Sequence, residues 1–161
     1  MAKQVINIGT NSNDGTGDSI RDAFDKTNDN FTELYAEPAI VLVCGGVEAN
    51  IAQKTGVVFF RLPKNRSFTL TALPIAVMKV APTDSAAQFD IKDDGTTIFS
   101  TVLSIDDGEY TSEDSAAPCV LTSTPYTFAA GSVITVDITQ IGSTVAGQEP
   151  IVTLYGYYTI V

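Results

Sequence analysis

Hydrophobic and polar residues follow two different patterns along the chain, and the change falls near Pro38. Residues 1–37 are polar and rich in Asn, Asp, Thr and Gly, and their apolar side chains recur at helical spacing. Residues 38–161 contain short apolar runs rich in Val, Ile, Thr, Phe and Tyr, with turn-forming residues between them. The pattern predicts an N-terminal arm with one α-helix (residues 1–37), followed by a single β domain (residues 38–161).

The predicted helix is amphipathic and follows a turn-rich loop at residues 9–17, before which residues 5–8 alternate as in one short strand. Asp18 or Ser19 is a suitable N-cap, and Pro38 ends the helical pattern. A lone helix of about 18 residues is marginal in water, so its apolar face must dock on something. We expect docking either on the chain's own β domain or, as we favour, on a partner or on sister copies. The residues of this face are Ile20, Phe24, Phe31, Leu34 and Tyr35.

The second region has the pattern of an all-β domain. Alternation is clearest at residues 67–72 and 133–141, and Asp93-Asp94-Gly95 indicates a compact hairpin. About eight to ten short strands over roughly 120 residues fit a β-sandwich or jelly-roll-like domain, and the pattern leaves the strand order open. The other runs with strand character lie at residues 39–44, 56–62, 75–80, 88–92, 96–100, 102–105, 109–111, 119–122 and 151–160.

Composition narrows the possible functions. The 161 residues carry a net charge of −10 with a pI near 4.1, no His, no Trp and two Cys. Without His there is no Ser-His-Asp or Cys-His catalytic group and no His-ligated metal site. The acidic balance argues against binding nucleic acid through its phosphates. Cys44 and Cys119 each lie in an apolar run, so we expect two buried free thiols, although the sequence does not show whether they pair.

No residue set predicts an active site, a metal site or a cofactor. The acidic clusters at residues 90–94 and 106–114 adjoin glycine, and turn formation accounts for them. Tyr110, Tyr155 and Tyr157 are candidates for stacking on a host-surface glycan, or else for covering a sheet or a contact between subunits. No apolar run reaches the length of a transmembrane helix and the N-terminus lacks a signal-peptide pattern, so we expect no membrane insertion.

Two sets of residues resemble known bacteriophage proteins. The first lies at residues 6–10, 13–18, 21–24, 28, 30–31 and 33–35, and it resembles a segment near the N-termini of structural proteins of tailed bacteriophages, among them fibre-like, neck and baseplate-associated proteins. The second, at residues 68–72, 81–83, 89–91, 95–98, 105–109, 134–138 and 142–144, resembles a small β-sandwich module of phage virion proteins. The resemblance implies an attachment or assembly role for the N-terminal segment and, in phage appendages of this kind, a homotrimer.

The sequence and the resemblance together lead to one hypothesis. The chain is a non-enzymatic virion structural protein, assembled in the host cytoplasm, whose N-terminal arm anchors it to the tail, neck, baseplate or capsid. Its β domain faces outward as a fibre-like or decoration component. Its partners are other virion proteins and copies of itself, with a trimer favoured. The alternative is a receptor-binding module that recognises a host-surface glycan through the three tyrosines.

Overall fold

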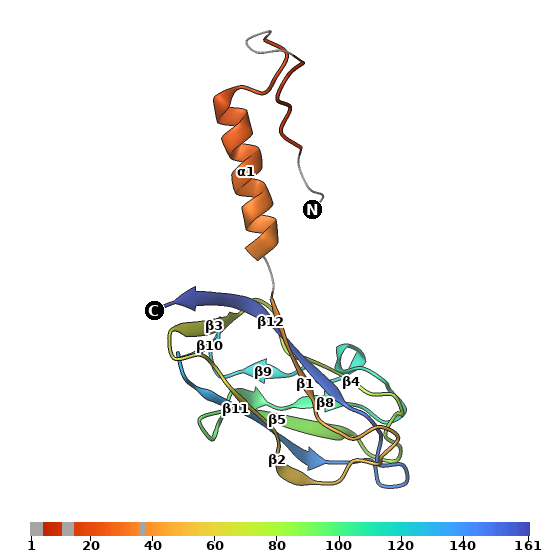
Figure 1. The fold of residues 1–161 in the computed structure, drawn as a ribbon. Coiled ribbons are helices and arrows are strands. Elements are labelled where there is room, and N and C mark those ends of the chain that lie inside the picture. Colours follow the sequence, from red (N-terminus) through yellow and green to blue (C-terminus); the bar gives the residue numbers. More distant parts are fainter. Residues whose placement is uncertain (1–4, 11–14, 36–37) are drawn as a thin grey trace. The chain divides into compact units, whose positions relative to one another are not determined.

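The computed structural model describes residues 5–10, 15–35 and 38–161, without the side chains of residues 32–35. The chain divides into two compact units, Met1–Ala36 and Glu37–Val161, and each is described by itself. The first contains helix α1 (Ile20–Tyr35), drawn in orange in Figure 1. The second contains all the strands and one short 3-10 helix, η1 (Ser112–Asp114). The predicted fold class, mainly β with one helix before the β domain, is confirmed.

Helix α1 begins after Ser19. Of the two N-cap candidates, Asp18 and Ser19, Ser19 is therefore the N-cap. The Asp22 N–H donates to Ser19 Oγ at 3.1 Å, and Ser19 Oγ donates to Asp22 Oδ2 at 2.7 Å. These bonds satisfy a helix-end donor and place a carboxylate at the positive end of the helix dipole. The prediction of a short strand at residues 5–8 was wrong, since this segment has no strand conformation. The backbone N–H and C=O of Asn7 instead bond to Asp18, in the loop before α1, and not to a strand.

The β domain is an eight-stranded jelly roll with four short accessory strands. If β4, β6, β7 and β9 are set aside, the other strands, counted 1 to 8 along the chain, have sheet orders 1-8-3-6 and 2-7-4-5. Successive strands thus alternate between the two sheets except for strands 4 and 5, which are neighbours in one sheet, and this is jelly-roll topology. The strands are β1 (Ala39–Val43), β2 (Lys54–Arg61), β3 (Arg66–Leu70), β4 (Ile75–Val77), β5 (Ala87–Asp93), β6 (Thr96–Thr97), β7 (Phe99–Thr101), β8 (Leu103–Ile105), β9 (Val120–Leu121), β10 (Thr127–Phe128), β11 (Val133–Gln140) and β12 (Ile151–Ile160).

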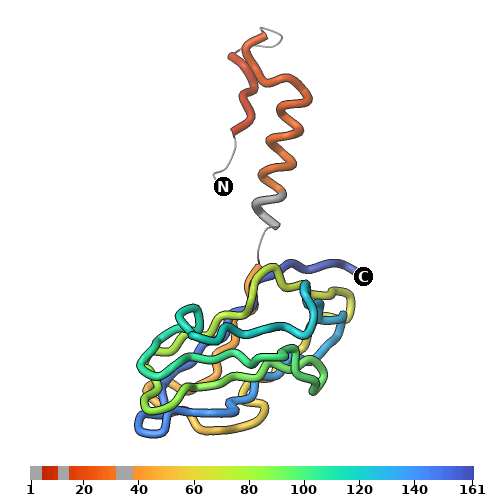
Figure 2. The backbone as a smooth tube through the Cα atoms, turned by 180° about the vertical axis from the view of Figure 1, so that it is seen from behind, coloured from red at the N-terminus to blue at the C-terminus, as the bar shows by residue number. Residues whose placement is uncertain are grey.

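The long strand β12 is the centre of the first sheet. It pairs with β1 on one edge, from Ala39↔Tyr155 to Val43↔Ile151, and with β3 and β4 on the other. Strand β11 is the centre of the second sheet, between β2 and β5. β1 and β12 lie in front in Figure 1, and strands of the second sheet, drawn in green between residues 85 and 105, lie in front in Figure 2. The sheets enclose a core that includes the fully buried Phe68, Phe89 and Phe128.

The short strands show where the sequence pattern misleads. The hairpin at Asp93-Asp94-Gly95 is present, with positive φ at Asp94 and Gly95 between β5 and β6. The strand expected at residues 96–100 is split, because the N–H of the buried Ile98 donates to Ile91 O before the chain turns away to pair with β9. Residues 109–111 form only a single bridge, Val77↔Thr111, and β10 has no counterpart among the expected strands.

Both cysteines are buried and free. Burial raises the pKa of Cys44 to about 12 and also raises the pKa of Cys119. Their thiolates are therefore scarce at neutral pH, and both thiols are unreactive.

Candidate docking site in the N-terminal unit

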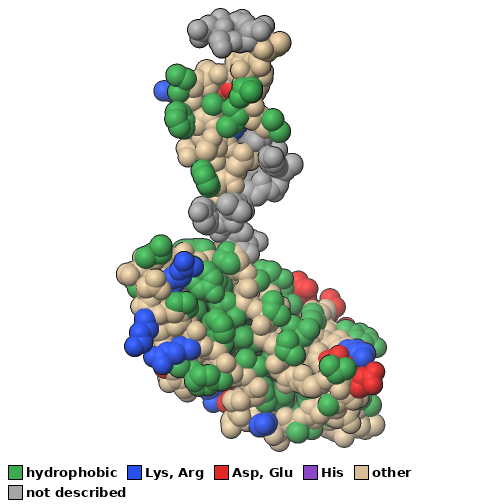
Figure 3. All heavy atoms as spheres, viewed as in Figure 1, with side chains coloured by type: hydrophobic (Ala, Val, Ile, Leu, Met, Phe, Trp, Pro, Cys, Tyr) green, Lys and Arg blue, Asp and Glu red, His purple; other side chains and the backbone are tan. Residues whose placement is uncertain are grey.

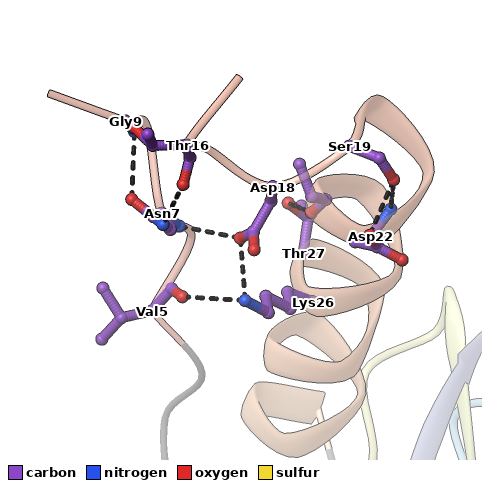
Figure 4. Close-up of polar contacts among 10 residues, drawn as sticks. Val5, Asn7, Gly9, Thr16, Asp18, Ser19, Asp22, Lys26 and Thr27 are labelled. Atoms are coloured by element: carbon purple, nitrogen blue, oxygen red, sulfur yellow. Dashed lines mark hydrogen bonds and ion pairs between the residues drawn. The ribbon is translucent and has the colours of Figure 1, made fainter. Parts of the chain in front are cut away.

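Residues 5–9 are held against α1 by a polar clasp, which we define as Asn7, Asp18 and Lys26 (Figure 4). The Asn7 N–H donates to Asp18 Oδ2 at 2.8 Å, and the Asp18 N–H donates to Asn7 O at 2.8 Å. Lys26 Nζ donates to the same Asp18 oxygen at 2.7 Å and to Val5 O at 3.3 Å. One carboxylate thus joins the arm, the loop end and the second turn of the helix.

The side chain of Asn7 also closes the loop between the arm and the helix. Its Nδ2 donates to Thr16 O at 2.7 Å, and its Oδ1 accepts from the Gly9 N–H at 3.0 Å. The loop approaches so closely that a Cβ on Gly17 would lie 3.0 Å from Asn7 O and 3.1 Å from Gly9 N. The close approach of the backbone therefore favours glycine at position 17, because a Cβ there would push these atoms apart.

The clasp depends on the charge of Asp18. The hydrogen bond from Lys26 and the backbone N–H of Asn7 hold the pKa of Asp18 below its ordinary value of 3.8. A carboxyl whose pKa is lowered by folding stabilises the folded form when it is ionised. The clasp is accordingly complete at neutral pH and is lost as pH falls below 3.8.

The arm covers one face of α1 and leaves another exposed. Ala23, Lys26 and Thr27 are half-buried. On the adjacent face, the exposed fractions are 78% for Ile20, 65% for Phe24 and 51% for Phe31. Ile20 and Phe24 are one helical turn apart, and Phe31 follows two turns later, so the three form one stripe. The clasp thus joins residues 5–9 to the helix and leaves Ile20 and Phe24 exposed.

We call Ile20, Phe24 and Phe31 the exposed stripe. The other two residues expected on it, Leu34 and Tyr35, belong to α1, but their side chains lie outside the described residues.

The positions Ile20, Phe24, Thr27 and Phe31 are spaced by four, three and four residues. This is the heptad spacing with which one helix packs along another. Thr27 fits such a seam because its hydroxyl donates to Ala23 O at 2.8 Å, inside its own helix. The stripe is therefore shaped to contact another helix or an apolar groove.

The three candidate tyrosines do not form one cluster. Tyr155 and Tyr157 lie on the same face of β12, as expected from the two-residue period. Tyr110 lies near the other end of β12. Its neighbour Thr111 forms a β-bridge with Val77, and Val77 pairs with Ile151 at the start of β12. Four residues of strand separate Ile151 from Tyr155, or about 13 Å. One sugar ring can therefore contact Tyr155 and Tyr157 together, but Tyr110 only separately.

Asp106 and Asp107 accept hydrogen bonds from other loops of the domain. Asp106 accepts from the Ala116 N–H at 2.8 Å and from the hydroxyls of Ser104 and Ser115. Asp107 accepts from the Asp84 N–H at 2.8 Å. Within the described part of the chain, no three acidic, Cys or His side chains are arranged to hold a metal ion. In the same part, no helix is both long and apolar enough to span a membrane.

Sequence reasoning missed the clasp. The spacing of four residues between Asp22 and Lys26 would favour an ion pair within the helix. The structure pairs Lys26 with Asp18 instead, because Ser19 engages the carboxylate of Asp22. The useful signal was Asn7, whose short polar side chain precedes a glycine-rich loop.

Comparison with known protein families locates one match, in the part of the chain that contains the clasp and the stripe. The family model described as "Bacteriophage T4 gp9/10-like protein, N-terminal" matches residues 3–60. The matched segment spans the N-terminal unit and continues through β1 into β2. Comparisons with curated proteins and with solved structures found no match. The family match supports a structural protein of a tailed-bacteriophage virion.

Proposed function

We propose that this virion structural protein is anchored to the tail, neck, baseplate or capsid by its N-terminal unit and carries the jelly roll as an outward-facing module. The observation that carries the proposal is the exposed stripe. Ile20 and Phe24 have most of their surface exposed on the helix that the clasp joins to residues 5–9. The stripe also lies inside the segment that matches the phage family, residues 3–60.

Physical chemistry supports a docking role for this helix. An isolated helix of 16 residues is marginal in water, so packing of its apolar face supplies most of its stability. Burying one phenylalanine side chain contributes about 1.5–3 kcal/mol. Ile20 and Phe24 together can therefore give a specific contact of useful strength. The heptad spacing suits either a helix of another virion protein or the same helix of sister copies, for which we favour a trimer.

The role that we propose is structural and not catalytic. Asp106 and Asp107, two carboxylates that could be suspected of acid–base chemistry, accept hydrogen bonds from backbone N–H groups. The match to a phage structural family also favours a non-enzymatic protein. No step of attachment requires a cofactor.

Recognition of a host-surface glycan is a second candidate function. The neighbouring placement of Tyr155 and Tyr157 on one open sheet face is the observation in its favour. Replacing both residues by alanine should abolish saturable binding of the chain to host cells if this function is real. Unchanged binding would remove the two tyrosines from the glycan proposal.

Incorporation into particles tests the anchoring proposal. Phe24→Lys removes an apolar side chain from the stripe and keeps a good helix former. We expect it to weaken docking by about 1.5–3 kcal/mol, a loss of roughly tenfold to a hundredfold in affinity. The measurement is the amount of the protein per purified particle, determined by quantitative mass spectrometry.

Asp25→Lys is the matched control, because it introduces the same side chain at the adjacent exposed position, about 100° around the helix. Particles assembled with this control should carry the normal amount of protein. Normal incorporation of the Phe24→Lys chain would show that the stripe is not the anchor.

A further inference from the structure

The outer face of the first sheet is free of charge. Its side chains alternate with core residues along each strand, as in β1, where Val41 and Val43 are exposed while Ile40 and Leu42 are buried. We call this surface the neutral face. Its residues are Ala39, Val41 and Val43 of β1, Ser67 and Thr69 of β3, Ile75 and Val77 of β4, Thr127 of β10, and Ile151, Thr153, Tyr155, Tyr157 and Thr159 of β12.

The strand register brings these residues into continuous rows. Val43, Ile151 and Val77 lie side by side across three strands, and Val41, Thr153 and Ile75 form the next row. Figure 3 shows hydrophobic side chains gathered over β1 and β12, with Lys and Arg at one margin and a mixture of acidic and basic side chains at the opposite margin. The charges are thus excluded from the middle of this face.

The outer face of the second sheet is different. It carries Lys92 between Asp90 and Asp137, in addition to Arg61 and the exposed Phe59. A solvent-facing sheet side normally has such a mixture of polar and charged residues. The lack of charge on the neutral face is therefore not a general property of this domain, although the chain has 28 charged residues.

The neutral face alone is small for a specific contact. It is built from five residues of β1, nine of β12, eight of β3 and β4 together and two of β10, which at about 4.8 Å by 3.3 Å per residue give about 380 Å² of projected area. Two such faces together would cover about 760 Å², below the usual size of a biological interface that holds by itself. The area suits a contact that works together with a second one.

We infer that the neutral face is covered by a second copy of this chain. Each copy has a net charge of −10, so two copies repel wherever their acidic surfaces approach. Contact through the neutral face brings no like charges together. A charged partner, by contrast, would find no complementary group there. The inference rests on the proposed self-association and specifies a two-fold contact between copies, which is separate from the trimer contact proposed for α1.

Two engineered cysteines test the inference in the full chain. Thr153→Cys reports on the middle of the neutral face, and Thr135→Cys reports on the middle of the opposite outer face. Both positions are half-buried threonines on central strands, which makes them a matched pair. The native Cys44 and Cys119 are buried and remain unlabelled. The measurement is the rate of maleimide labelling at increasing protein concentration.

We expect labelling of Cys at position 153 to slow by about fivefold or more as the copies associate, while position 135 keeps a constant rate. Val41→Lys, next to Thr153 in register, should restore fast labelling at 153. Phe59→Lys, next to Thr135 in register, is the control and should leave protection at 153 intact.

Equal, concentration-independent rates at both positions would overturn the inference and leave the neutral face open, as glycan binding requires. Loss of protection with Phe59→Lys as well as with Val41→Lys would also overturn it. These outcomes are separate from the anchoring test, because labelling is measured on the purified chain and incorporation is measured on particles.

Discussion

The ion pair between Lys92 and Asp137 gives the sharpest test of the energetics of the β domain. The two side chains meet at 2.6 Å, and the Gly56 N–H donates to the other oxygen of Asp137 at 2.6 Å. Asp90 lies directly opposite Asp137 across the sheet, 3.9 Å from Lys92 Nζ. Lys92 therefore separates two facing carboxylates, of which Asp137 has only 6% of its side chain exposed.

Lys92→Met removes the cation and keeps the aliphatic stem. Breaking a fully buried ion pair from one side costs about 3–5 kcal/mol. Because 29% of the Lys92 side chain is exposed, solvent compensates in part, and we expect a loss of about 2–3 kcal/mol in the free energy of unfolding. For a domain of this size that is a fall of about 8–12 °C in Tm.

The pH dependence follows from Asp137. Burial opposes its ionisation, but hydrogen bonds from Lys92 and Gly56 outweigh burial and lower the pKa of Asp137 below 3.8 in the native chain. The native chain therefore loses this stabilisation as pH falls below 3.8. Without Lys92, burial and Asp90 raise the pKa of Asp137, so folding of the variant is penalised at neutral pH and the penalty disappears on acidification. The difference in stability between the two proteins should shrink as pH falls.

Urea denaturation of both proteins at neutral and acidic pH measures this difference. Asp137→Asn in the Lys92→Met background removes the uncompensated charge and should recover part of the loss. A Lys92→Met protein as stable as the native chain at neutral pH would refute the reasoning, as would a difference that grows on acidification.

Two further predictions follow from other parts of the structure. Gly156→Ala would place a Cβ 2.2 Å from Thr69 O, so we expect thermal unfolding to show a loss of about 3 kcal/mol or more in the free energy of unfolding. Gly46→Ala is the control, because its Cβ would have its nearest contact at 3.6 Å and the free energy of unfolding should hardly change. Asp18→Asn should open the clasp, and the Asn7 amide should then exchange its hydrogen with solvent faster than in the native chain. In the native chain the protection of this amide should decrease when the pH is lowered below 3.8. Equally fast exchange of the Asn7 amide in both proteins at neutral pH would contradict the clasp.

The local pattern of hydrophobic and polar residues predicted the long strands and the helix well, but it did not predict the order of the strands in the sheets. The run at residues 151–160 was predicted with the bounds of β12, because it is long, β-rich and bounded by a proline. The order of the strands depends on pairings such as β1 with β12, which join residues more than a hundred positions apart. A local hydrophobic pattern contains no information on such pairings.

The candidate surfaces show the same division. The apolar stripe of α1 could be predicted from its spacing alone, since Ile20, Phe24 and Phe31 lie on one face of one local element. The clasp was missed because it joins three segments through a single carboxylate. The neutral face was missed because it exists only once β1, β3, β4, β10 and β12 are placed side by side.

Immunogold electron microscopy of intact particles, with antibody raised against the chain, tests the central claim most directly. Our account predicts gold label on particles carrying the native chain and on those assembled with Asp25→Lys, and little or no label on those assembled with Phe24→Lys. Label on the tail, neck or baseplate would place the protein in the adsorption apparatus, and label over the capsid would make it a decoration component. Absence of label from particles assembled with the native chain would contradict the account.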